Sequence, residues 1–538
     1  MGSARRLINP GGTRHGFDPT PRLCLGYDSG GQQIQSHTLA YRRPPDQDSA
    51  TPVRHPVVVL GAGPVGPSLA IDLAQRGRRV LLLDNGDRLS TGSRAICFAK
   101  RTLEIWDRLG VGDPMCDKGV EWNVGKVDFK DALLYPFNLL PEPGHERPAF
   151  INLQQYYAEA FLVVRAAELP NIEIRWKNSV AALEQTADGV VLGVDTPDGR
   201  YSIAACDGSR SAMRSLVGQE SKGRIFRDRF LVADAAGAGA VSFPAEHWFW
   251  FDPPFHRHQS VLLYMQPDGV WRIDFQLGWD ADPEEERKPE RIKPRVDAMM
   301  RQALAQEVPF ELECASVYTF ACLRMAAFCH DRVLFAGDSA HGVSPFGARG
   351  ANSGVQDAEH LAWKRDLVLR AQAPEALLDS YGVEREFAAD ENILNSTRAT
   401  DFITPKSEIS RLFRDATLDL ARDYGFARRI VNSGRLSVPA TMHASPLNTP
   451  DVDHFADAMV PGAPAADAPL LAAGLPLKTV IVSDGGLHDA DGLAARRYDA
   501  QPGTAYLRRP DQHICARWRM PTPAAVADAL RRAQAQAN

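Results

Sequence analysis

Long apolar segments are missing from this sequence. Its apolar runs are as short as those at 57–60 and 80–83, far below the roughly 20 residues that cross a membrane. An excess of positive charge is also missing, because the formal net charge is -6, and this argues against a nucleic-acid partner. The eight cysteines are scattered without a CxxC pair, which argues against a metal site and is typical of free thiols in a reducing cytoplasm. We therefore expect a cytoplasmic protein with no membrane span and no metal.

The remaining composition is that of a globular protein, with 44% hydrophobic and 24% charged residues. A chain of 538 residues is too long for one simple core, so we expect two or three packed units. Residues 1–52 are instead rich in Gly, Pro, Gln, Arg and Asp and lack the apolar stretch of a secretory signal. We predict that they form a polar, solvated extension.

A glycine-rich turn follows the first apolar run. Residues 57–66 read VVVLGAGPVG, and a helical pattern, a second apolar strand and Asp84 come next. Gly61 is expected to make the tight turn, Gly63 to admit a pyrophosphate close to the backbone, and Gly66 to let the helix pack on the strand. Asp84 stands where a carboxylate can accept both ribose hydroxyls. Strand, turn, helix, strand and acid in this order predict a dinucleotide-binding unit.

A second motif lies near the middle of the chain. A short apolar strand leads into residues 206–211, which read CDGSRS and contain Asp207 and Gly208. By itself this pattern is a polar turn between a strand and a helix.

A third motif lies further downstream, where a predicted buried strand at 333–336 ends in Gly337 and Asp338. Asp338 can accept hydrogen bonds from ribityl hydroxyls. A loop rich in Pro and Gly follows, and a helix is predicted from about Val355. Backbone amides of this loop can reach the edge of a flavin, and the positive N-terminus of the helix would stabilise the reduced ring. The loop residues that we assign to the cofactor from this pattern are Gly350 and Asn352.

Together the three motifs resemble those of the single-component FAD-dependent aromatic hydroxylases, the p-hydroxybenzoate hydroxylase-like flavoprotein monooxygenases. The resemblance covers about residues 57–364. Segments 248–254 (WFWFDPP) and 271–278 (WRIDFQLG) look most like the branch of 3-(3-hydroxyphenyl)propionate hydroxylase-type enzymes. The implied cofactor is FAD, and Asp207 and Gly208 of the second motif are similar to a family motif associated with binding of both FAD and NAD(P)H. NAD(P)H is implied as a transient co-substrate, since no second dinucleotide fingerprint is present.

The resemblance implies an α/β fold with a Rossmann-like FAD-binding domain, an inserted mixed or antiparallel β-sheet substrate domain, and a shortened thioredoxin-like C-terminal region. The tail lacks the CxxC of disulfide exchange. The predicted boundaries are 1–52 for the extension, 53–118 with 151–218 and 331–400 for the FAD-binding domain, 119–150 with 219–330 for the substrate domain, 401–461 for a helical region, and 462–538 for the tail.

Three further positions are matched by resemblance alone. Arg94 is similar to an arginine that contacts the cofactor, although a surface salt bridge is the alternative. Gln155 is similar to a glutamine that touches FAD, although a helix-capping role is the alternative. Pro345 is similar to the loop proline beside the flavin ring. The residues between the second and third motifs alternate apolar and polar side chains, which predicts an antiparallel sheet with one covered face.

The implied reaction is hydroxylation of a small phenolic substrate with O2 through a flavin C4a-hydroperoxide. The substrate then needs a group that accepts its proton and a pocket that excludes water. Arg272 and Tyr264 are our catalytic candidates with Pro345; a structural or solvent-facing role is the alternative for the first two. Asp274 and His247 are further candidates, and His341 could relay a proton, although a structural hydrogen bond is favoured for it.

One feature departs from the family pattern. Phenol hydroxylases of this group can place a carboxylate just after the Arg94 position, whereas residues 95–98 read AICF. Other functions therefore stay open: a non-aromatic oxygenase of Baeyer–Villiger or epoxidising type, a reductase on the same fold, or a non-catalytic flavin-binding remnant. The resemblance also allows a homodimer.

Overall fold

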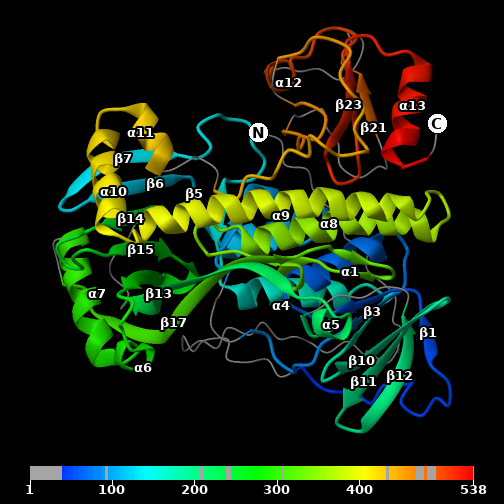
Figure 1. Cartoon of the computed structure of the whole chain (residues 1–538), viewed down its shortest axis with the longest axis horizontal. Helices are drawn as coiled ribbons and strands as arrows, with labels where there is room; N and C mark the ends of the chain where they lie inside the picture. The colour runs from blue at the N-terminus through cyan, green and yellow to red at the C-terminus, as the bar shows by residue number, and fades with distance from the viewer. Residues whose placement is uncertain are drawn as a thin grey trace, which may run out of the picture.

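The computed structural model describes residues 39–90, 95–205, 211–237, 244–304, 307–431, 436–456, 459–467, 478–481 and 492–536 (Figure 1). Figure 1 shows a sheet body on the left, a dinucleotide-binding body on the right, the long helix α9 across both, and the C-terminal tail on top. None of the helices in the described ranges combines the length and the hydrophobicity that a membrane crossing requires.

Three parallel strands form the centre of the dinucleotide-binding body. They lie in the order β2 (Val58–Leu60), β3 (Val80–Leu83) and β9 (Ile172–Arg175). Both strands predicted around the glycine-rich turn are thus present, with fully buried side chains as expected for parallel strands. The helices of this body are α1 (Val65–Gln75), α4 (Gln155–Ala167) and α8 (Gly350–Leu369). Helix α1 contacts all three strands, and α8 packs along α1.

A four-stranded sheet adjoins this body, and residues 39–52 approach it. Its strands lie in the order β1 (Val53–His55), β12 (Gly199–Ala205), β11 (Gly189–Thr196) and β10 (Ser179–Thr186). Most of residues 39–52 are exposed, as a solvated extension would be, but the segment is anchored to this body at a few buried side chains. Leu39 is buried beside Leu89 and Val163, and the Asp46 carboxylate lies 2.7 Å from Arg175 and 2.9 Å from His55. Residues 1–38 lie outside the described residues.

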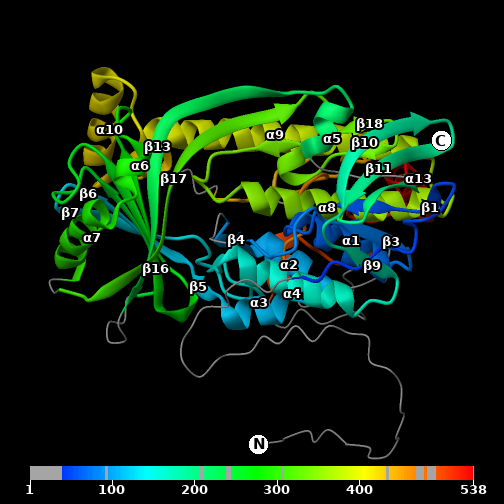
Figure 2. The same ribbon diagram turned by 90° about the horizontal axis from the view of Figure 1, so that it is seen from below.

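The left-hand body is an eight-stranded, mainly antiparallel sheet, as the alternating pattern predicted, but the expectation of one covered face is wrong, because the strands at its centre are buried on both faces. Its strands lie in the order β20 (His341–Gly342), β17 (Phe310–Met325), β13 (Ser221–Gly237), β16 (Val270–Leu277), β15 (Ser260–Met265), β14 (His247–Phe251), β6 (Val124–Phe129) and β7 (Ala132–Asn138). Figure 2 shows that the long strands β13 and β17 run from this sheet toward the dinucleotide-binding body.

The two faces of this sheet have different neighbours. Helices α6 (Pro283–Glu286) and α7 (Pro289–Leu304) follow β16, and α7 covers one face, where Met299 packs with Trp271 and Ile273. We call this the outer face. The opposite, inner face carries Tyr264 and Phe251, whose apolar cluster includes residues of the C-terminal helices. Successive residues of a strand alternate between the two faces, so each strand contributes to both.

Short elements connect the two bodies. They are α2 (Lys100–Leu109), α3 (Gly112–Lys118), α5 (Ser211–Leu216), the 3-10 turns η1 (Pro267–Gly269) and η2 (Gly337–Ser339), the sheet of β4 (Cys97–Ala99), β8 (Phe150–Asn152) and β5 (Val120–Trp122), and the pair β18 (Cys329–His330) and β19 (Val333–Leu334). The predicted strand at 333–336 is thus shortened to β19. The helix predicted from Val355 begins five residues earlier, because Ser353 already donates its N–H to the Arg349 carbonyl.

Three helices follow, α9 (Ala376–Ile403), α10 (Glu408–Ala421) and α11 (Gly425–Val431). Helix α10 begins with a capping box in which Ser407 and Ser410 satisfy each other's backbone amides. It turns Arg414 and Leu418 inward. The tail contains β21 (Lys478–Ile481), α12 (Leu493–Tyr498), β22 (Ala505–Arg508), β23 (Ile514–Trp518) and α13 (Pro523–Ala533). Its strands form an antiparallel sheet in the order β21-β22-β23.

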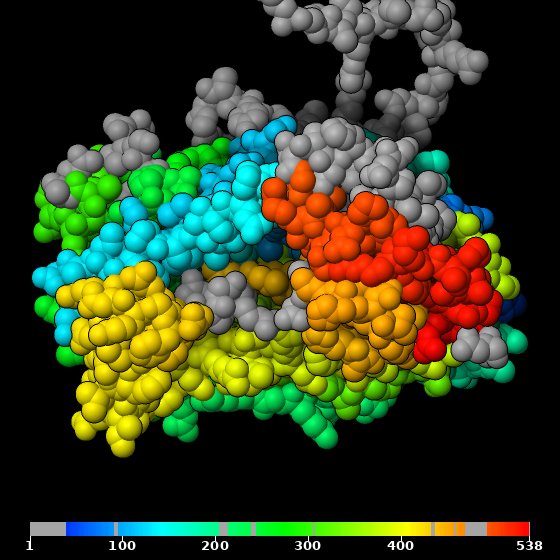
Figure 3. Space-filling view, turned by 90° about the horizontal axis from the view of Figure 1, so that it is seen from above, coloured from blue at the N-terminus to red at the C-terminus, as the bar shows by residue number. Residues whose placement is uncertain are grey.

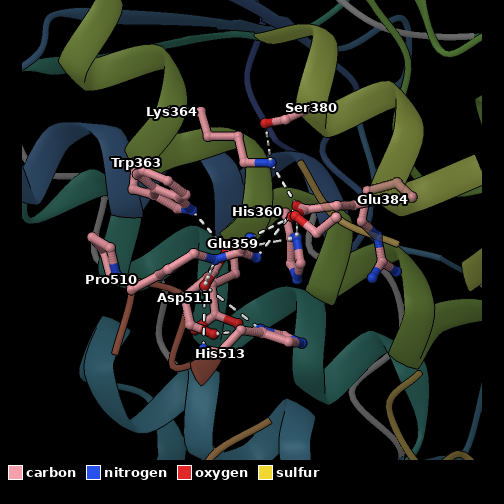
Figure 4. A network of polar contacts seen from close by, with 12 residues as sticks. Glu359, His360, Trp363, Lys364, Ser380, Glu384, Pro510, Asp511 and His513 are labelled. Atoms are coloured by element: carbon pink, nitrogen blue, oxygen red, sulfur yellow. Dashed lines mark hydrogen bonds and ion pairs between the residues drawn. The ribbon is translucent and has the colours of Figure 1, made fainter. Parts of the chain in front are cut away.

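The tail docks on α8 and α9 through a buried polar network (Figure 4). Arg509 donates to Asp511 at 3.0 and 2.8 Å and also to Glu384 of α9. Trp363 of α8 donates to Asp511 at 2.8 Å, and Lys364 donates to Glu384 at 2.6 Å. All five side chains are buried. Because each buried charge faces an opposite charge, the network holds the tail hairpin against both helices.

His360, Asp511 and His513 in this network offer ligand atoms that lie within 4.8 Å of one another. Such a grouping has the composition of a cation site, and it could not be predicted from the sequence because His360 lies on α8, far along the chain from the hairpin. However, the Asp511 carboxylate already accepts hydrogen bonds from Arg509 and Trp363. Burial lowers the pKa of His360 to about 3. We assign the group to docking of the tail.

Removing the Asp511 charge tests this docking. Asp511→Asn leaves Arg509 with only one carboxylate in a fully buried site, so we expect a loss of about 3–5 kcal/mol in the free energy of unfolding measured with urea. Asp528→Asn removes a carboxylate from an exposed pair with Arg531 and should cost at most about 1 kcal/mol. Equal effects of both substitutions would contradict a structural role for the network.

Candidate active site

The glycine-rich turn after β2 has the geometry that the sequence predicted. Gly61 has a φ of 99°, in the left-handed region that favours glycine, and donates its N–H to the Leu83 carbonyl at 2.7 Å. A Cβ added to Gly66 would lie 1.9 Å from the Gly61 carbonyl oxygen. The turn therefore brings the N-terminus of α1 against the end of β2, with Gly63 between them, and leaves the first amides of the helix for an anion.

Asp84 lies where the prediction placed it, directly after β3. One carboxylate oxygen accepts the Ala62 N–H at 2.6 Å, and the other accepts the Gly86 N–H at 2.7 Å. These bonds hold the carboxylate at the carboxyl ends of β2 and β3, beside the glycine-rich turn. This position fits the ribose of a dinucleotide.

The third motif packs directly against the first. Val65 of α1 lies between two glycines: a Cβ added to Gly354 would come within 2.6 Å of its Cγ2 atom, and one added to Gly337 within 3.0 Å. Gly337 has a φ of 61°. Asp338 is exposed, next to this contact. The first and third motifs, far apart in sequence, therefore form one cradle.

Asn352 fixes the loop that leads into α8. Its side-chain oxygen accepts from Ala99 N–H at 2.8 Å and from the Thr102 hydroxyl at 2.6 Å. Its side-chain nitrogen donates to the carbonyls of Cys97 at 2.9 Å and Ala348 at 2.6 Å. The predicted cofactor residue thus uses its side chain to hold the loop on β4 and α2. Its backbone, beside Gly350 at the start of α8, stays the part that faces a cofactor in our prediction.

The second motif reaches the same place through Arg214 of α5. This side chain donates to the carbonyls of Ser339 at 3.0 Å and Asp338 at 3.3 Å. Asp207, Gly208 and the predicted contact residue Arg94 lie outside the described residues.

Gln155 begins α4 and bridges two segments. It accepts from the Ala95 N–H at 3.1 Å and donates to Glu159 at 2.7 Å. His341 lies 2.7 Å from Asp357, so the favoured structural hydrogen bond is present. Burial opposes ionisation of Asp357, yet the neighbouring Arg385 and His341 hold the pKa of this carboxyl well below its usual range.

The catalytic candidates form a row across the inner face of the sheet. His247, Tyr264, Arg272 and Asp234 face one another on the neighbouring strands β14, β15, β16 and β13. Arg272 is buried and donates to both carboxylate oxygens of Asp234 at 2.8 and 2.7 Å. Such a bidentate pair holds the guanidinium in one orientation. Burial lowers the pKa of His247 to about 3, so it is neutral.

Asp274 lies two residues further along β16 on the same face. Burial raises its pKa to about 7, while the positive charge of Arg272 and the nearby Tyr264 hydroxyl oppose this rise. Burial and the Asp274 charge raise the pKa of Tyr264 well above its usual range. A carboxyl that titrates near neutral pH next to a tyrosine can take up and release a proton during a reaction.

A cavity of about 580 Å³ opens between this inner face, the loop at Pro345 and the C-terminal helices. Figure 3 shows α10 and α11, in yellow, against the cyan segment that contains β6 and β7. The aromatic side chains that line it are Phe137, Phe249, Phe251, Phe346, Phe402 and Phe413. Arg272 and Tyr264 are not among its lining residues, whereas Phe346 and Gly347, next to Pro345, are.

The sequence prediction missed most of this cavity. The alternation of WFWF at 248–251 was a usable signal, because it places Phe249 and Phe251 on one face of β14. The residues that α9, α10 and α11 contribute gave no signal, since their positions depend on how these helices fold back over the sheet.

Comparison with known proteins identifies the cofactor. The family described as FAD binding domain matches residues 54–396, well over half of the chain. The chain belongs to this family. Its glycine cradle, Asp84 and the loop held by Asn352 fit FAD. The glycine cradle would meet the pyrophosphate, Asp84 the ribose, and the loop the flavin ring.

Two curated relatives are similar over most of the chain. A 3-(3-hydroxy-phenyl)propionate/3-hydroxycinnamic acid hydroxylase of Mycolicibacterium smegmatis is 27% identical over 409 residues, 72% of this chain and 70% of the relative. A probable NADH-specific resorcinol 4-hydroxylase of Rhodococcus jostii is 31% identical over 343 residues, 61% of this chain and 62% of the relative.

Two solved structures have a similar fold. The flavin-dependent monooxygenase PieE, solved with FAD and substrate, has a TM-score of 0.72 at 19% identity and covers 90% of this chain and 100% of its own. The p-nitrophenol 4-monooxygenase PnpA of Pseudomonas putida has a TM-score of 0.61 at 24% identity and covers 72% of this chain and 99% of its own. The predicted FAD-binding α/β fold is confirmed.

Gly66→Ala tests the cradle. The added Cβ would overlap the Gly61 carbonyl, so the turn must open at a cost of about 1–3 kcal/mol, and we expect most of the bound FAD to be lost. The ratio of flavin to protein absorbance after gel filtration measures this loss. Gly278→Ala is the control, because its Cβ would meet no atom within 4 Å. Full flavin content in the Gly66 variant would refute the proposed contact.

Proposed function

We propose that the chain is an FAD-dependent monooxygenase that takes electrons from NAD(P)H and hydroxylates a phenolic aromatic substrate. The observation that carries this proposal is an aromatic-lined cavity that includes Phe346 and Gly347 of the flavin loop. An apolar pocket of this size suits an aromatic ligand. The names of the curated relatives, a hydroxyphenylpropionate hydroxylase and an NADH-specific resorcinol hydroxylase, support the phenol and the nicotinamide.

Bound FAD would supply the redox chemistry that transfers one atom of O2 to the ring. The chain's own residues bind and orient the substrate and exclude water. The aromatic walls of the cavity keep its interior apolar, which protects reactive species from hydrolysis. Pro345, beside this wall, restricts the loop that carries the ring-facing residues.

Tyr264 and Asp274 are assigned to proton transfer. The phenol loses its proton as the ring is attacked, and the Tyr264 hydroxyl can accept it while passing its own proton to Asp274, the carboxyl on the neighbouring strand of the same face. This role requires the phenol to extend from the cavity toward β15 and β16. Arg272, held by Asp234, supplies a fixed positive charge beside Asp274 and favours its carboxylate form.

Anaerobic stopped-flow absorbance tests the function directly. The FAD-loaded protein is mixed with NADH or NADPH, with and without simple phenols, and bleaching of the flavin band is followed. We expect one phenol to accelerate bleaching sharply, and oxygen then to give a product with one added hydroxyl. Equal bleaching without any phenol would favour a reductase or a non-aromatic oxygenase. Absence of bleaching with either nucleotide would favour a non-catalytic flavin-binding remnant.

The pH profile tests Asp274. Its pKa of about 7 means that the carboxylate form increases as pH rises through 7, so hydroxylation should accelerate over this range. Asp274→Asn cannot accept a proton, so we expect a rate about 100-fold lower and no rise near pH 7. Asp128→Asn is the matched control, since burial raises the Asp128 pKa to about 6 on another strand of the same sheet. A wild-type profile in the Asp274 variant would exclude this role.

Three predictions from the sequence concern properties outside the site. We propose a cytoplasmic location, a homodimer as the assembly, and the domain boundaries given above. Sedimentation of the FAD-loaded protein at several concentrations distinguishes a monomer from a dimer.

A further inference from the structure

The cavity beside the flavin loop is larger than one phenol ring requires. Its volume is about 580 Å³, whereas the seven non-hydrogen atoms of phenol fill only about 200 Å³ at the roughly 30 Å³ that a water-sized group occupies in a liquid. Among the described residues, neither the glycine cradle nor Asp84 lines this cavity, so its space is additional to the site assigned to the cofactor. A substrate with a single ring would therefore leave most of the cavity unfilled, whereas binding sites are normally well packed.

The cavity is also long. It follows the last part of α9 from Asn395 to Ile403, and both residues line it. Eight residues of an α-helix extend for about 12 Å, which is longer than a single aromatic ring. The flavin loop contacts the first part of this stretch, because the Ser344 hydroxyl accepts from the Thr400 hydroxyl at 2.8 Å and donates to the Ser396 carbonyl at 3.3 Å. The far end of the cavity therefore lies toward α10.

This far end is an apolar mouth that is open to solvent. Phe413 of α10 and Ile430 of α11 both line the cavity, yet they are 59% and 48% exposed. Large apolar side chains left in water can bind apolar surface of a ligand with a gain in free energy. One ring bound at the flavin loop would not reach them across about 12 Å, whereas a second ring attached to it would.

The aromatic walls between the two ends are held by contacts with other rings. Phe346 packs edge-on against Phe230 and Phe320, with ring centroids 5.0 and 5.4 Å apart. Phe251 meets Phe402 edge-on at 5.8 Å. Rings fixed in this way keep the cavity from collapsing around a small ligand, and they offer the edges and faces against which flat aromatic rings pack.

We propose that the substrate is a phenol with at least two aromatic rings, fused or directly linked. Its hydroxylated ring lies at the flavin-loop end, and its other ring extends toward Phe413 and Ile430. This inference rests on the proposed function and adds a substrate class to it. It also suits the position of Tyr264 outside the cavity lining, because a longer substrate can reach toward β15 while its second ring stays anchored at α10. The C-terminal helices then select the length of the substrate.

Binding of two probes of different length tests the proposal. The FAD-loaded protein is titrated with phenol and with 4-phenylphenol, and the change in flavin absorbance gives each Kd. A second ring buries on the order of 100 Å² of apolar surface, so we expect 4-phenylphenol to bind at least about 10-fold more tightly than phenol. Phe413→Ala removes the wall that the second ring would contact. It should weaken binding of 4-phenylphenol by about 5- to 20-fold and change binding of phenol by less than about 2-fold.

Leu412→Ala is the matched control, because Leu412 is a large apolar residue on the same helix that is 71% exposed and does not line the cavity. It should leave both Kd values unchanged, which separates binding in the cavity from nonspecific adhesion of an apolar probe. The proposal is overturned if phenol binds as tightly as 4-phenylphenol, if Phe413→Ala weakens both probes equally or no more than Leu412→Ala does, or if neither probe binds.

A second variant removes space instead of a wall. Ala399 lines the cavity from α9, between Asn395 and Ile403, and Ala399→Leu adds three carbon atoms there. We expect it to weaken binding of 4-phenylphenol by about 10-fold or more and to change binding of phenol by less than about 3-fold. Unchanged binding of 4-phenylphenol to this variant would contradict the proposed position of the second ring.

Failure of this inference can be told apart from failure of the proposed function. If phenol binds as tightly as 4-phenylphenol and accelerates flavin bleaching by NAD(P)H as well, the hydroxylase function stands and the inference is wrong. If 4-phenylphenol binds selectively through Phe413 but no phenol alters bleaching, the binding site stands and the proposed function is wrong.

Discussion

The close approach of α1 to α8 is the contact on which the site depends. It is possible only because Gly337 and Gly354 lack a Cβ atom where they meet Val65, and α1 itself is positioned by Gly66, which lacks a Cβ atom where it meets the Gly61 carbonyl. This packing joins a turn near residue 61 to a turn near residue 337, so two halves of one cofactor cradle come from distant segments. Asn352 extends the contact by holding the following loop on β4 and α2. A side chain at Gly337 or Gly354 would separate the halves, and one at Gly66 would open the turn at Gly61.

The two faces of the large sheet carry different kinds of side chain. The outer face is apolar and covered by α7, which gives the sheet its stability. The inner face carries the buried row of Tyr264, Arg272 and Asp234, with Asp274 beside it. Burying ionisable groups costs free energy unless they are paired, and the pairing of Arg272 with Asp234 meets this cost. Asp274 is left with a pKa that burial raises to about 7, which is the basis of its proposed role in proton transfer.

The local features of the cofactor site could be predicted from the sequence, because each depends on neighbouring residues. The turn at Gly61 and the acid at Asp84 follow from one strand–helix–strand pattern, and the structure places both as expected. The antiparallel sheet followed from alternation of side chains. The side-chain role of Asn352, the docking of residues 39–52 and the network around Asp511 were missed, because their partners lie many residues away.

The sequence by itself determined the cofactor class, the order of the motifs and the antiparallel character of the large sheet, since these depend on local backbone geometry and side-chain periodicity. Only the tertiary structure decided which of those residues share a cavity. Arg414 illustrates the difference: in the sequence it is one arginine on an amphipathic helix, and only the folding of α10 over the sheet places it beside Phe251. The side chains that line a buried site come from distant segments of the chain, so their identity depends on how the helices and the sheet pack together.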